Sequence, residues 1–331
     1  MARRSRGLIL GLLLALAGCV ARLAPPGPPV RAPAMESGAF VMRDGARLPY
    51  RAWLPEGPPK AVVLALHGFN DSRDAWAIPA PSFTAAGIAL YAPDQRGFGA
   101  APGRGLWPGT KALAGDARRM ARLLHRRYPH AKLFLMGESM GAAVLMVLAT
   151  APAPPPVAGY ILSAPAVWGR KEMSVFMTAG LWVAARLVPG LALSGAQVAV
   201  RASDNNAALR QLFEDPLTIR RTRFDTLRGL VDLMDHALAA ASHFRARALF
   251  LYGRHDHLVP KHAMADVWRA VLAHGNGRQR LAFYPKGYHL LLRDLVRAAP
   301  IGDIIAWIDH PLAPLPSGAG LRARSWLARR R

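Results

Sequence analysis

The sequence of 331 residues is poor in two residue types that often define a protein's class. It contains a single cysteine, so no disulfide can form within the chain, and lysine is scarce although lysine and arginine together number 43. Acidic residues number only 20, which leaves a formal net charge of +23. A charge of this size suggests nucleic acid or an anionic membrane as a partner, but the basic residues are scattered and no nucleic-acid-binding motif is present. We therefore expect no nucleic acid partner, and we attribute the charge to a compositional bias toward arginine. The positive charge would attract the protein to anionic lipid headgroups.

The sequence also lacks an N-terminal apolar run long enough to cross a membrane, because the apolar segment there covers only residues 7–17. This segment follows a cluster of arginines and leads through small residues to Cys19, an order that resembles a bacterial lipoprotein signal peptide over residues 1–18. The resemblance implies lipidation of Cys19 and a lipid-anchored protein of the cell envelope. Because Val20 rather than aspartate follows, we expect the outer membrane. An ordinary signal peptide with an incidental cysteine is the alternative.

Residues 19–37 are rich in proline and predict an extended, semi-rigid tether that holds a folded domain away from the bilayer. The domain is expected to begin near Gly38, with a hairpin over residues 40–53 that turns at Asp44-Gly45. We expect the following division: a core at residues 38–166 and 245–310, a helical insertion at 167–244, and a basic tail at 311–331.

Apolar runs alternate with helical patterns through both core segments. The runs predict buried strands at residues 61–66, 88–92, 132–137, 157–163, 248–252 and 280–284. The patterns between them predict helices at residues 110–127, 261–273 and 301–308. Such alternation indicates an α/β fold with a mostly parallel sheet and helices on both faces. Functional residues are then expected at the C-terminal ends of strands.

The segment Gly-Glu-Ser-Met-Gly, residues 137–141, joins a predicted strand to an apolar segment with helical character. It has the G-x-S-x-G pattern of a nucleophile elbow, in which Ser139 is exposed at the tip of a strained turn. Gly137 and Gly141 suit such a turn because side chains there would clash where strand and helix approach each other. A glycine-rich turn with a solvent-facing serine is the alternative, since five residues alone are weak evidence.

A serine nucleophile needs a base, and the base needs an acid to orient it. His289 follows the last predicted strand, and Asp256 follows the strand before it, so the chain order is Ser, Asp, His. Asp94 is a rival acid, but it precedes Ser139. Alone, Asp256 would be read as a helix cap and His289 as a surface histidine. Their placement behind successive strands, after an elbow, favours a catalytic triad.

These motifs together resemble a known family. The strings HGFND, DQRGFG, GESMG, GRHDHLVP and KGYH, at their intervals across residues 38–310, are similar to α/β-hydrolases of the monoacylglycerol lipase and lysophospholipase group. The resemblance implies an α/β-hydrolase fold, with Ser139 as nucleophile, Asp256 as acid and His289 as base. It also implies an oxyanion hole formed by the backbone N–H groups of Phe69 and Met140.

The expected activity is therefore hydrolysis of carboxylic esters of lipids, either monoacylglycerol or lysophospholipid, through an acyl-enzyme on Ser139. This chemistry needs no organic cofactor and no metal. The neighbouring histidines at 255, 257 and 262 could suggest a metal site, but Asp256 among them already has a role and the sequence shows no further ligand cluster. A short-chain carboxylesterase or thioesterase is one alternative. A catalytically silent surface lipoprotein that binds a partner through the insertion is another. The sequence does not indicate an oligomeric state.

The insertion contains an apolar stretch from Met173 to Leu193. It suggests a lid over the elbow, whose apolar residues would contact a fatty acyl chain or the bilayer surface. The candidate substrate-binding residues are Val175, Phe176, Met177, Leu181 and Trp182. Packing of the insertion against the core explains the same residues equally well, because apolar helical stripes usually face a core.

Overall fold

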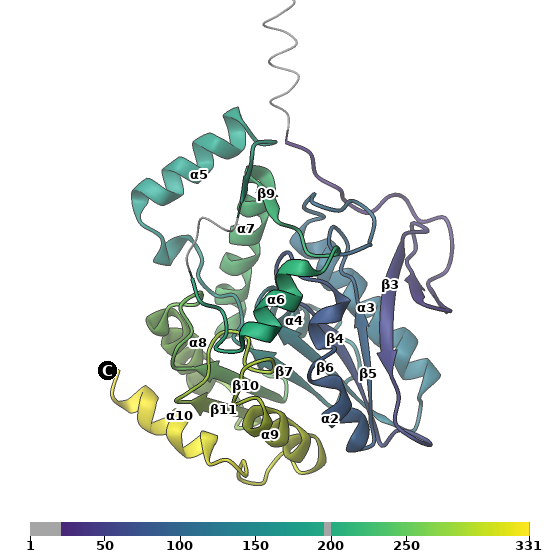
Figure 1. Cartoon of the computed structure of the whole chain (residues 1–331), viewed down its shortest axis with the longest axis vertical. Helices are drawn as coiled ribbons and strands as arrows, with labels where there is room; N and C mark the ends of the chain where they lie inside the picture. Colours follow the sequence, from purple (N-terminus) through teal and green to yellow (C-terminus); the bar gives the residue numbers. More distant parts are fainter. Residues whose placement is uncertain (1–20, 195–199, 331) are drawn as a thin grey trace, which may run out of the picture.

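The computed structural model describes residues 21–194 and 200–330, which form a central sheet with helices on both sides (Figure 1). The sheet has the strand order β1-β2-β3-β5-β4-β6-β7-β10-β11. Its strands are β1 (Ala34–Glu36), β2 (Ala39–Val41), β3 (Arg47–Trp53), β4 (Ala61–Leu66), β5 (Ile88–Pro93), β6 (Lys132–Glu138), β7 (Gly159–Ser163), β10 (Ala248–Gly253) and β11 (Gln279–Tyr284). The pairs from β5 to β11 are all parallel, whereas β1, β2 and β3 pair antiparallel at one edge.

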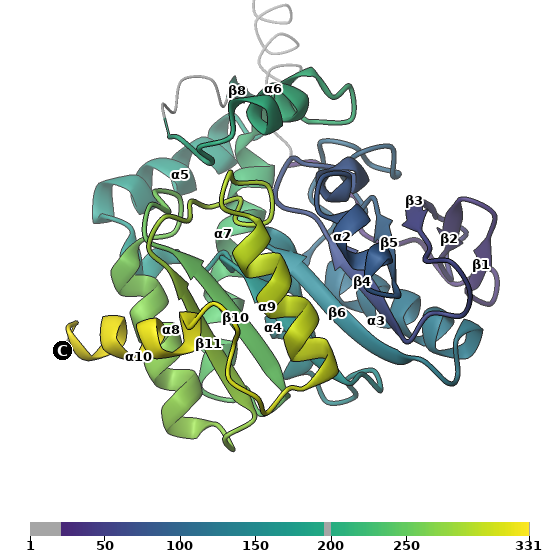
Figure 2. The same ribbon diagram turned by 60° about the horizontal axis from the view of Figure 1, so that its bottom comes forward.

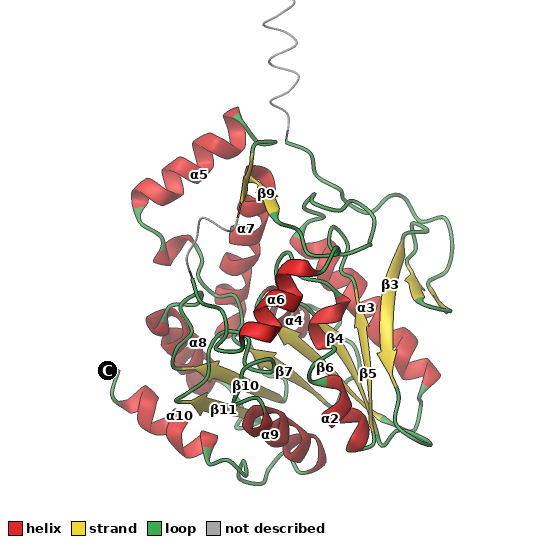
Figure 3. Cartoon of the chain, in the orientation of Figure 1, coloured by secondary structure: helices red, strands yellow, loops and turns green. Residues whose placement is uncertain are grey.

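Helices cover both faces of this sheet, as the colouring by secondary structure shows (Figure 3). The helices are α2 (Ala80–Ala85), α3 (Thr110–Arg127), α4 (Met140–Ala149), α5 (Val175–Leu187), α6 (Asn206–Glu214), α7 (Phe224–Ala241), α8 (Lys261–His274), α9 (Ala298–Asp309) and α10 (Ala319–Ala328). One apolar core lies between the sheet and α3, α4, α7 and α8, and a second lies between the sheet and α2 and α9. Strand residues alternate between them, because successive side chains of a strand point to opposite faces: Val62 and Leu64 lie in the first core and Val63 in the second.

The strands predicted from apolar runs are all present, with ends that differ by no more than two residues. The α3 helix matches its predicted range of 110–127. The predicted hairpin is confirmed as β2 and β3, which pair antiparallel around a turn where Gly45 has a φ of 77°. The prediction of a mostly parallel α/β sheet is therefore confirmed.

The insertion differs from the all-helical segment that we expected. Besides α5, α6 and α7 it contains two short strands, β8 (Ala192–Ser194) and β9 (Arg221–Arg223), which pair antiparallel in a separate sheet. Figure 2 shows α5, α6 and β8 lying together above the strand ends of the large sheet. By contrast α7 packs against α4, and its buried residues Leu233, Ala237 and Ala241 belong to the first apolar core. The last helix of the insertion is thus part of the main α/β body.

The N-terminal segment was expected to be an extended, semi-rigid tether, and the described part of it is hydrogen-bonded to the folded body. We call residues 21–33 the N-terminal strap. The Arg22 N–H donates to Asp225 Oδ2 at 3.1 Å, and the Ala24 N–H donates to the Trp107 carbonyl at 3.0 Å. Farther along, Val30 N–H donates to the Arg43 carbonyl at 2.8 Å. Proline donates no hydrogen bond, so the non-proline residues between the prolines make these attachments.

The Arg-rich C-terminal tail is also packed. Within it, α10 lies against β11, and the ring of Trp326 stacks on Phe283 with a centroid distance of 5.0 Å. Trp326 is 6% exposed, so the tail completes the edge of the first apolar core. Among the described residues, no helix is long and apolar enough to cross a membrane. Cys19 and the predicted signal peptide lie outside the described residues.

Candidate active site

Ser139 lies at the tip of the sharp turn between β6 and α4. Its backbone is in the left-handed region, with a φ of 54° and a ψ of −113°. The flanking glycines permit the turn: a Cβ on Gly137 would lie 2.5 Å from the Ala142 nitrogen, and a Cβ on Gly141 would lie 2.3 Å from the Leu66 carbonyl oxygen. Both distances are too short for any other residue. The close approach of strand and helix predicted for the elbow is therefore confirmed.

Asp256 and His289 face each other at the same sheet edge, behind β10 and β11. Asp256 Oδ2 lies 2.8 Å from His289 Nδ1, while Asp256 Oδ1 accepts the N–H groups of Leu258 and Val259 at 2.8 and 2.9 Å. The backbone bonds orient the carboxylate so that Oδ2 is available to the ring. A neutral histidine that donates Nδ1–H to a carboxylate has an unprotonated Nε2, which is the form a general base requires.

The surroundings of His289 also shift its proton affinity. The side chain is buried, which by itself disfavours the charged ring, but the Asp256 carboxylate and its hydrogen bond outweigh burial and raise the pKa of His289 above its ordinary value. Glu138 raises this pKa further, and Arg293 lowers it. The Asp256 carboxylate would thus stabilise an imidazolium formed during catalysis.

The two predicted oxyanion donors belong to separate loops beside Ser139. Met140 is the first residue of α4, and Phe69 follows β4. Within the described ranges, neither of these N–H groups donates a hydrogen bond. The Phe69 loop approaches the elbow closely, since a Cβ on Gly68 would lie 3.5 Å from Ser139 Cβ. Both N–H groups are therefore available to an oxyanion at this position.

His67 fixes the Phe69 loop and does not take part in the triad. The Gln95 N–H donates to His67 Nε2 at 3.1 Å, so Nδ1 carries the proton and donates to the Gly68 carbonyl at 2.8 Å. The Gln95 side chain also donates to the His67 carbonyl at 2.8 Å. The HGFND and DQRGFG motifs thus hold each other in place. The rival acid Asp94 is occupied elsewhere, accepting the N–H groups of Arg73 and Ala100.

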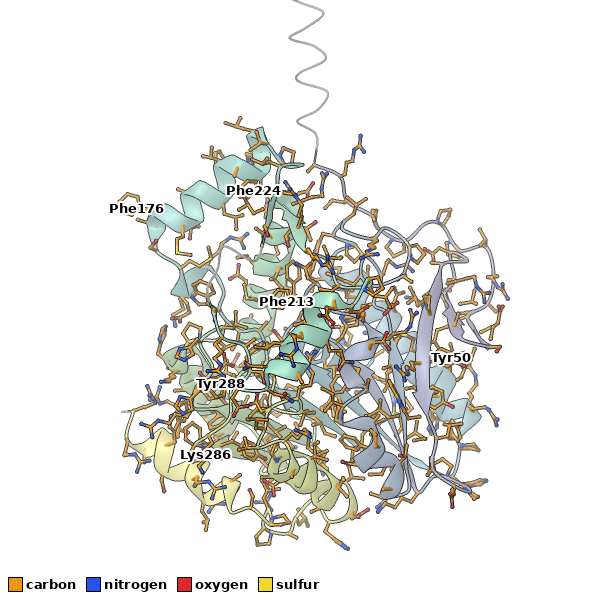
Figure 4. The ribbon with its side chains drawn as sticks, in the orientation of Figure 1. Tyr50, Phe176, Phe213, Phe224, Lys286 and Tyr288 are labelled. Carbon is orange, nitrogen blue, oxygen red and sulfur yellow. The ribbon has the colours of Figure 1, made fainter. Side chains whose placement is uncertain are left out.

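A cavity of about 790 Å³ has Ser139 and His289 in its wall. Most of its other lining is apolar and comes from the insertion. These apolar residues include Trp168, Met173, Met177, Leu181, Phe213, Ile219, Phe224, Leu230 and Met234. Figure 4 labels two of them, Phe213 on α6 and Phe224 on α7. The space and lining suit an apolar ligand that reaches the serine.

The five candidate substrate-binding residues of α5 divide into two groups. Met177 and Leu181 line the cavity, and Met177 is in addition 47% exposed to solvent. Val175, Phe176 and Trp182 are exposed, and Phe176 lies at the outer end of α5, away from the body (Figure 4). Arg186 lies over the Trp182 ring, 4.4 Å from its centroid. Successive residues of a helix point about 100° apart, which explains why neighbours such as Leu181 and Trp182 face opposite environments.

A group of buried charges beside the triad was missed in the sequence. Arg293 Nη2 donates to Asp71 Oδ2 at 2.8 Å and to Glu138 Oε1, and all three side chains are buried. Glu138 occupies a position that the G-x-S-x-G pattern leaves open, so the pattern gives it no role. One signal in the sequence could have indicated this group. Glu138 is next to the nucleophile in a turn that the fold buries, and a buried carboxylate requires a positively charged or hydrogen-bonding partner.

Comparison with known proteins gives the family of the chain. The family model described as Hydrolase_4, serine aminopeptidase S33, matches residues 57–295, a span that contains Ser139, Asp256 and His289. The chain belongs to this family. Its expected α/β-hydrolase fold is confirmed, and so is its assignment as a serine hydrolase.

Individual relatives carry lipase names. The chain is 24% identical over 271 residues to the monoacylglycerol lipase of Mycolicibacterium smegmatis, covering 82% of this chain and 95% of that protein. It is 26% identical over 304 residues to the monoglyceride lipase of Mus musculus, covering 88% and 96%. The crystal structure of a soluble variant of Saccharomyces cerevisiae monoglyceride lipase superposes with a TM-score of 0.69 at 18% identity, covering 86% and 98%.

Proposed function

We propose that the protein hydrolyses long-chain monoacylglycerols with Ser139 as the nucleophile. The observation that carries this proposal is the apolar cavity of about 790 Å³, which has Ser139 and the base of the Asp256–His289 pair in its wall. The names of the relatives support an ester-hydrolysing enzyme that acts on lipid esters.

The arrangement performs the reaction in two halves. Ser139 Oγ attacks the ester carbonyl while His289 takes its proton, and the resulting oxyanion is stabilised by the N–H groups of Phe69 and Met140. His289 then donates the proton to the leaving alcohol, which is glycerol for a monoacylglycerol, and an acyl-enzyme remains. Water, deprotonated by His289, attacks the acyl-enzyme and releases the fatty acid. Ser139, His289 and water are the only groups that accept or donate a proton or the acyl group in these steps.

The charges beside the serine favour a neutral headgroup. Asp71 and Glu138 contribute two negative charges and Arg293 one positive charge, so this buried group sums to −1. The positive charge of Arg293 is already taken by two carboxylates and is not available to a phosphate. Arg220, the other arginine in the cavity wall, is exposed to solvent. This favours monoacylglycerol over lysophospholipid, because a phosphate would bring a second negative charge toward the carboxylates.

The test compares esters that differ in one feature at a time. Monoacylglycerols of increasing chain length should show rising kcat/KM until the cavity is filled, since each buried methylene contributes about 0.8 kcal/mol. A lysophospholipid with the same acyl chain should be cleaved more slowly. Ser139→Ala should abolish hydrolysis and labelling by a fluorophosphonate probe, which reacts only with an activated serine.

Other outcomes would identify a different function. A preference for acetyl or butyryl esters would indicate a short-chain carboxylesterase, and a preference for acyl thioesters would indicate a thioesterase. Cleavage of aminoacyl anilides but not of acyl esters would indicate a peptidase, as the family description suggests. Absence of fluorophosphonate labelling in the wild-type protein would favour a catalytically silent, partner-binding lipoprotein.

We further propose that lipidated Cys19 anchors the protein to the outer membrane and that α5 docks on the bilayer. Support comes from the strap, whose first bonds join Arg22 to Asp225, next to β9, and from the position of α5 at the same end of the molecule (Figure 1). The exposed large apolar residues of α5 and the segment after it are Val175, Phe176, Met177, Trp182, Val183, Leu187, Val188 and Leu191. Docking in this orientation would bring a lipid substrate to the cavity that α5 partly lines.

A further inference from the structure

Arg293 forms the centre of a buried charge cluster with Asp71 and Glu138. One nitrogen, Nη2, donates to Asp71 Oδ2 at 2.8 Å and also to Glu138 Oε1. The residues are 4%, 5% and 2% exposed, in the order given. Burial would lower the pKa of Arg293, but the two carboxylates outweigh it and raise the pKa, so the guanidinium stays charged.

The three members come from three segments of the chain that form the site. Asp71 lies two residues after Phe69 in the oxyanion loop, Glu138 directly precedes Ser139, and Arg293 lies four residues after His289. A single guanidinium therefore connects the loop that carries Phe69, the elbow that carries Ser139 and the loop that carries His289. No other charged cluster in the described part of the chain connects all three.

Further bonds make each end of this connection rigid. Asp71 Oδ1 accepts the Ser72 N–H at 2.8 Å, and the Asp71 N–H donates to the Gly68 carbonyl at 3.3 Å, which closes a turn around Phe69. The Arg293 carbonyl accepts the Asn205 side-chain amide at 2.8 Å. A shift of Arg293 would thus move the turn that presents the Phe69 N–H relative to the elbow that presents the Met140 N–H.

We propose that Arg293 is a positioning residue that sets the separation of the two oxyanion donors by holding Asp71 and Glu138 together. The proposal rests on the proposed serine hydrolase mechanism and adds the device that assembles its oxyanion hole. Stability alone does not explain the cluster, because a buried ion pair is often no more stabilising than apolar residues of similar volume. The placement of its members beside Phe69, Ser139 and His289 gives the cluster a catalytic purpose.

The same cluster acts electrostatically on the base. The charged groups that face His289 are Asp256 and Glu138, which raise its pKa, and Arg293, which lowers it. Removing the Glu138 charge should therefore move the acidic limb of the pH–rate profile to lower pH. Removing the Arg293 charge should move the limb to higher pH.

The experiment measures kcat and KM on a soluble short-chain p-nitrophenyl ester across pH for Glu138→Gln, Arg293→Met and Arg293→Lys. We expect Arg293→Met to lower kcat by about 10² with KM nearly unchanged, which is the cost of one misplaced oxyanion donor. Arg293→Lys keeps the charge near the carboxylates and should recover part of this loss. Glu138→Gln keeps an acceptor oxygen for Arg293, so it should fold even where Arg293→Met does not.

The chain contains a matched control in Arg96. This buried arginine also bridges two carboxylates, Asp44 and Asp116, at 2.7 and 2.8 Å, but it contacts no triad residue. Arg96→Met should lower thermal stability and leave the midpoint of the acidic limb unchanged, because Arg96 is not among the charged groups that act on His289. The positioning proposal is overturned if folded Arg293→Met keeps the wild-type kcat. An acidic limb that Glu138→Gln leaves in place would contradict the electrostatic effect of the cluster on His289. The proposed function fails separately, if wild-type protein neither cleaves the ester nor labels with a fluorophosphonate.

Discussion

At the residue scale, Gly141 connects the local geometry of the elbow to catalysis. Gly141 has no space for a side chain because the Leu66 and His67 carbonyl oxygens lie 2.3 and 2.8 Å from the position of a Cβ. These atoms are backbone and cannot rotate away. The turn that presents Ser139 therefore depends on the absence of one carbon atom.

Gly141→Ala should consequently inactivate the enzyme and lower its stability. We expect destabilisation of about 1–3 kcal/mol, the usual cost of overpacking in a closely packed interior. Denaturant unfolding measures the stability, and fluorophosphonate labelling reports whether Ser139 is still activated. Gly180→Ala is the control, because a Cβ there meets nothing within 4 Å. An active, stable Gly141→Ala protein would show that the turn has a different shape.

The pH dependence of the wild-type enzyme follows from His289. The base must be neutral to accept the Ser139 proton, so the rate falls as pH decreases through its pKa. Because Asp256 raises that pKa, the midpoint of the acidic limb of kcat/KM should lie above about 6.5, the ordinary value for histidine. A stopped assay with a substrate that does not ionise measures this midpoint. A midpoint well below 6.5 would contradict the raised pKa.

Asp256→Asn tests the orientation of the base. The amide can retain a bond to the ring but favours the wrong tautomer, so kcat should fall by about 10⁴. The backbone N–H groups of Leu258 and Val259 still have an oxygen to bond, so thermal stability should change little. A Tm measurement beside the kinetics separates loss of chemistry from loss of fold.

Residues with a local signature could be predicted from the sequence, whereas pairings between distant residues could not. Ser139, Asp256 and His289 each follow an apolar run, and the parallel sheet brings the C-terminal ends of these runs together. The Arg293–Glu138 pair spans 155 positions and the Arg293–Asp71 pair spans 222, with no periodicity to reveal either. Only the folded chain shows that these charges are buried and therefore paired.

At the element scale, the insertion is joined to the loop that carries the base. The Leu290 N–H donates to the Ala202 carbonyl at 3.0 Å, and the Ser203 hydroxyl donates to Asp294 Oδ1 at 2.6 Å. Asp294 is buried, which raises its pKa to about 6 despite these bonds. Its other oxygen accepts the Tyr288 N–H at 2.6 Å, next to His289. A displacement of this part of the insertion would thus be transmitted to the base.

Asn205→Ala removes one of these connections. Asn205 Oδ1 accepts the N–H groups of Ala207 and Ala208 at the start of α6, and its amide donates to the Arg293 carbonyl. Loss of the helix cap and of a buried hydrogen bond should cost about 1–3 kcal/mol in the free energy of unfolding. We also expect a lower kcat, measured on a soluble ester. Unchanged stability and kcat would show that the connection has no effect.

The two faces of α5 should have separable functions. Leu181 lines the cavity, so Leu181→Ala should reduce kcat/KM for long-chain esters by about fivefold to tenfold, from the loss of about 1–1.5 kcal/mol of apolar contact, and spare short ones. Trp182 is 53% exposed, so Trp182→Ala should leave soluble esters unaffected and lower the rate only on vesicles. The reverse pattern would place Trp182 in the cavity. A Tm for each variant shows whether either residue is merely structural.

Long elements were easier to predict than short ones. The central strands are apolar on both faces, so their runs are continuous and unambiguous. The strands β8 and β9 have three residues each, and Arg221–Arg223 carries two arginines and no apolar residue. Nothing in that composition indicates a strand, and the pairing depends on where α5 and α7 place the two segments.

At the scale of the whole molecule, the strap determines where a membrane anchor would act. Cys19→Ser should block lipidation and release the protein from the membrane fraction, because acyl chains supply most of the anchoring free energy. Fractionation and mass spectrometry of the N-terminus measure this outcome. A Cys19→Ser protein that is processed and localised like the wild type would contradict the proposed anchor.

The strap also limits how far an anchored enzyme could travel from the lipid. Arg22 is three residue steps from Cys19, and at about 3.3–3.6 Å per step this length of chain spans about 11 Å at most. The catalytic body would then diffuse in two dimensions. Its rate of encounter with substrate would depend on the surface density of substrate in the membrane and not on the concentration of substrate in the bulk volume. Dilution of the bulk suspension at a constant surface composition would leave its rate per molecule unchanged.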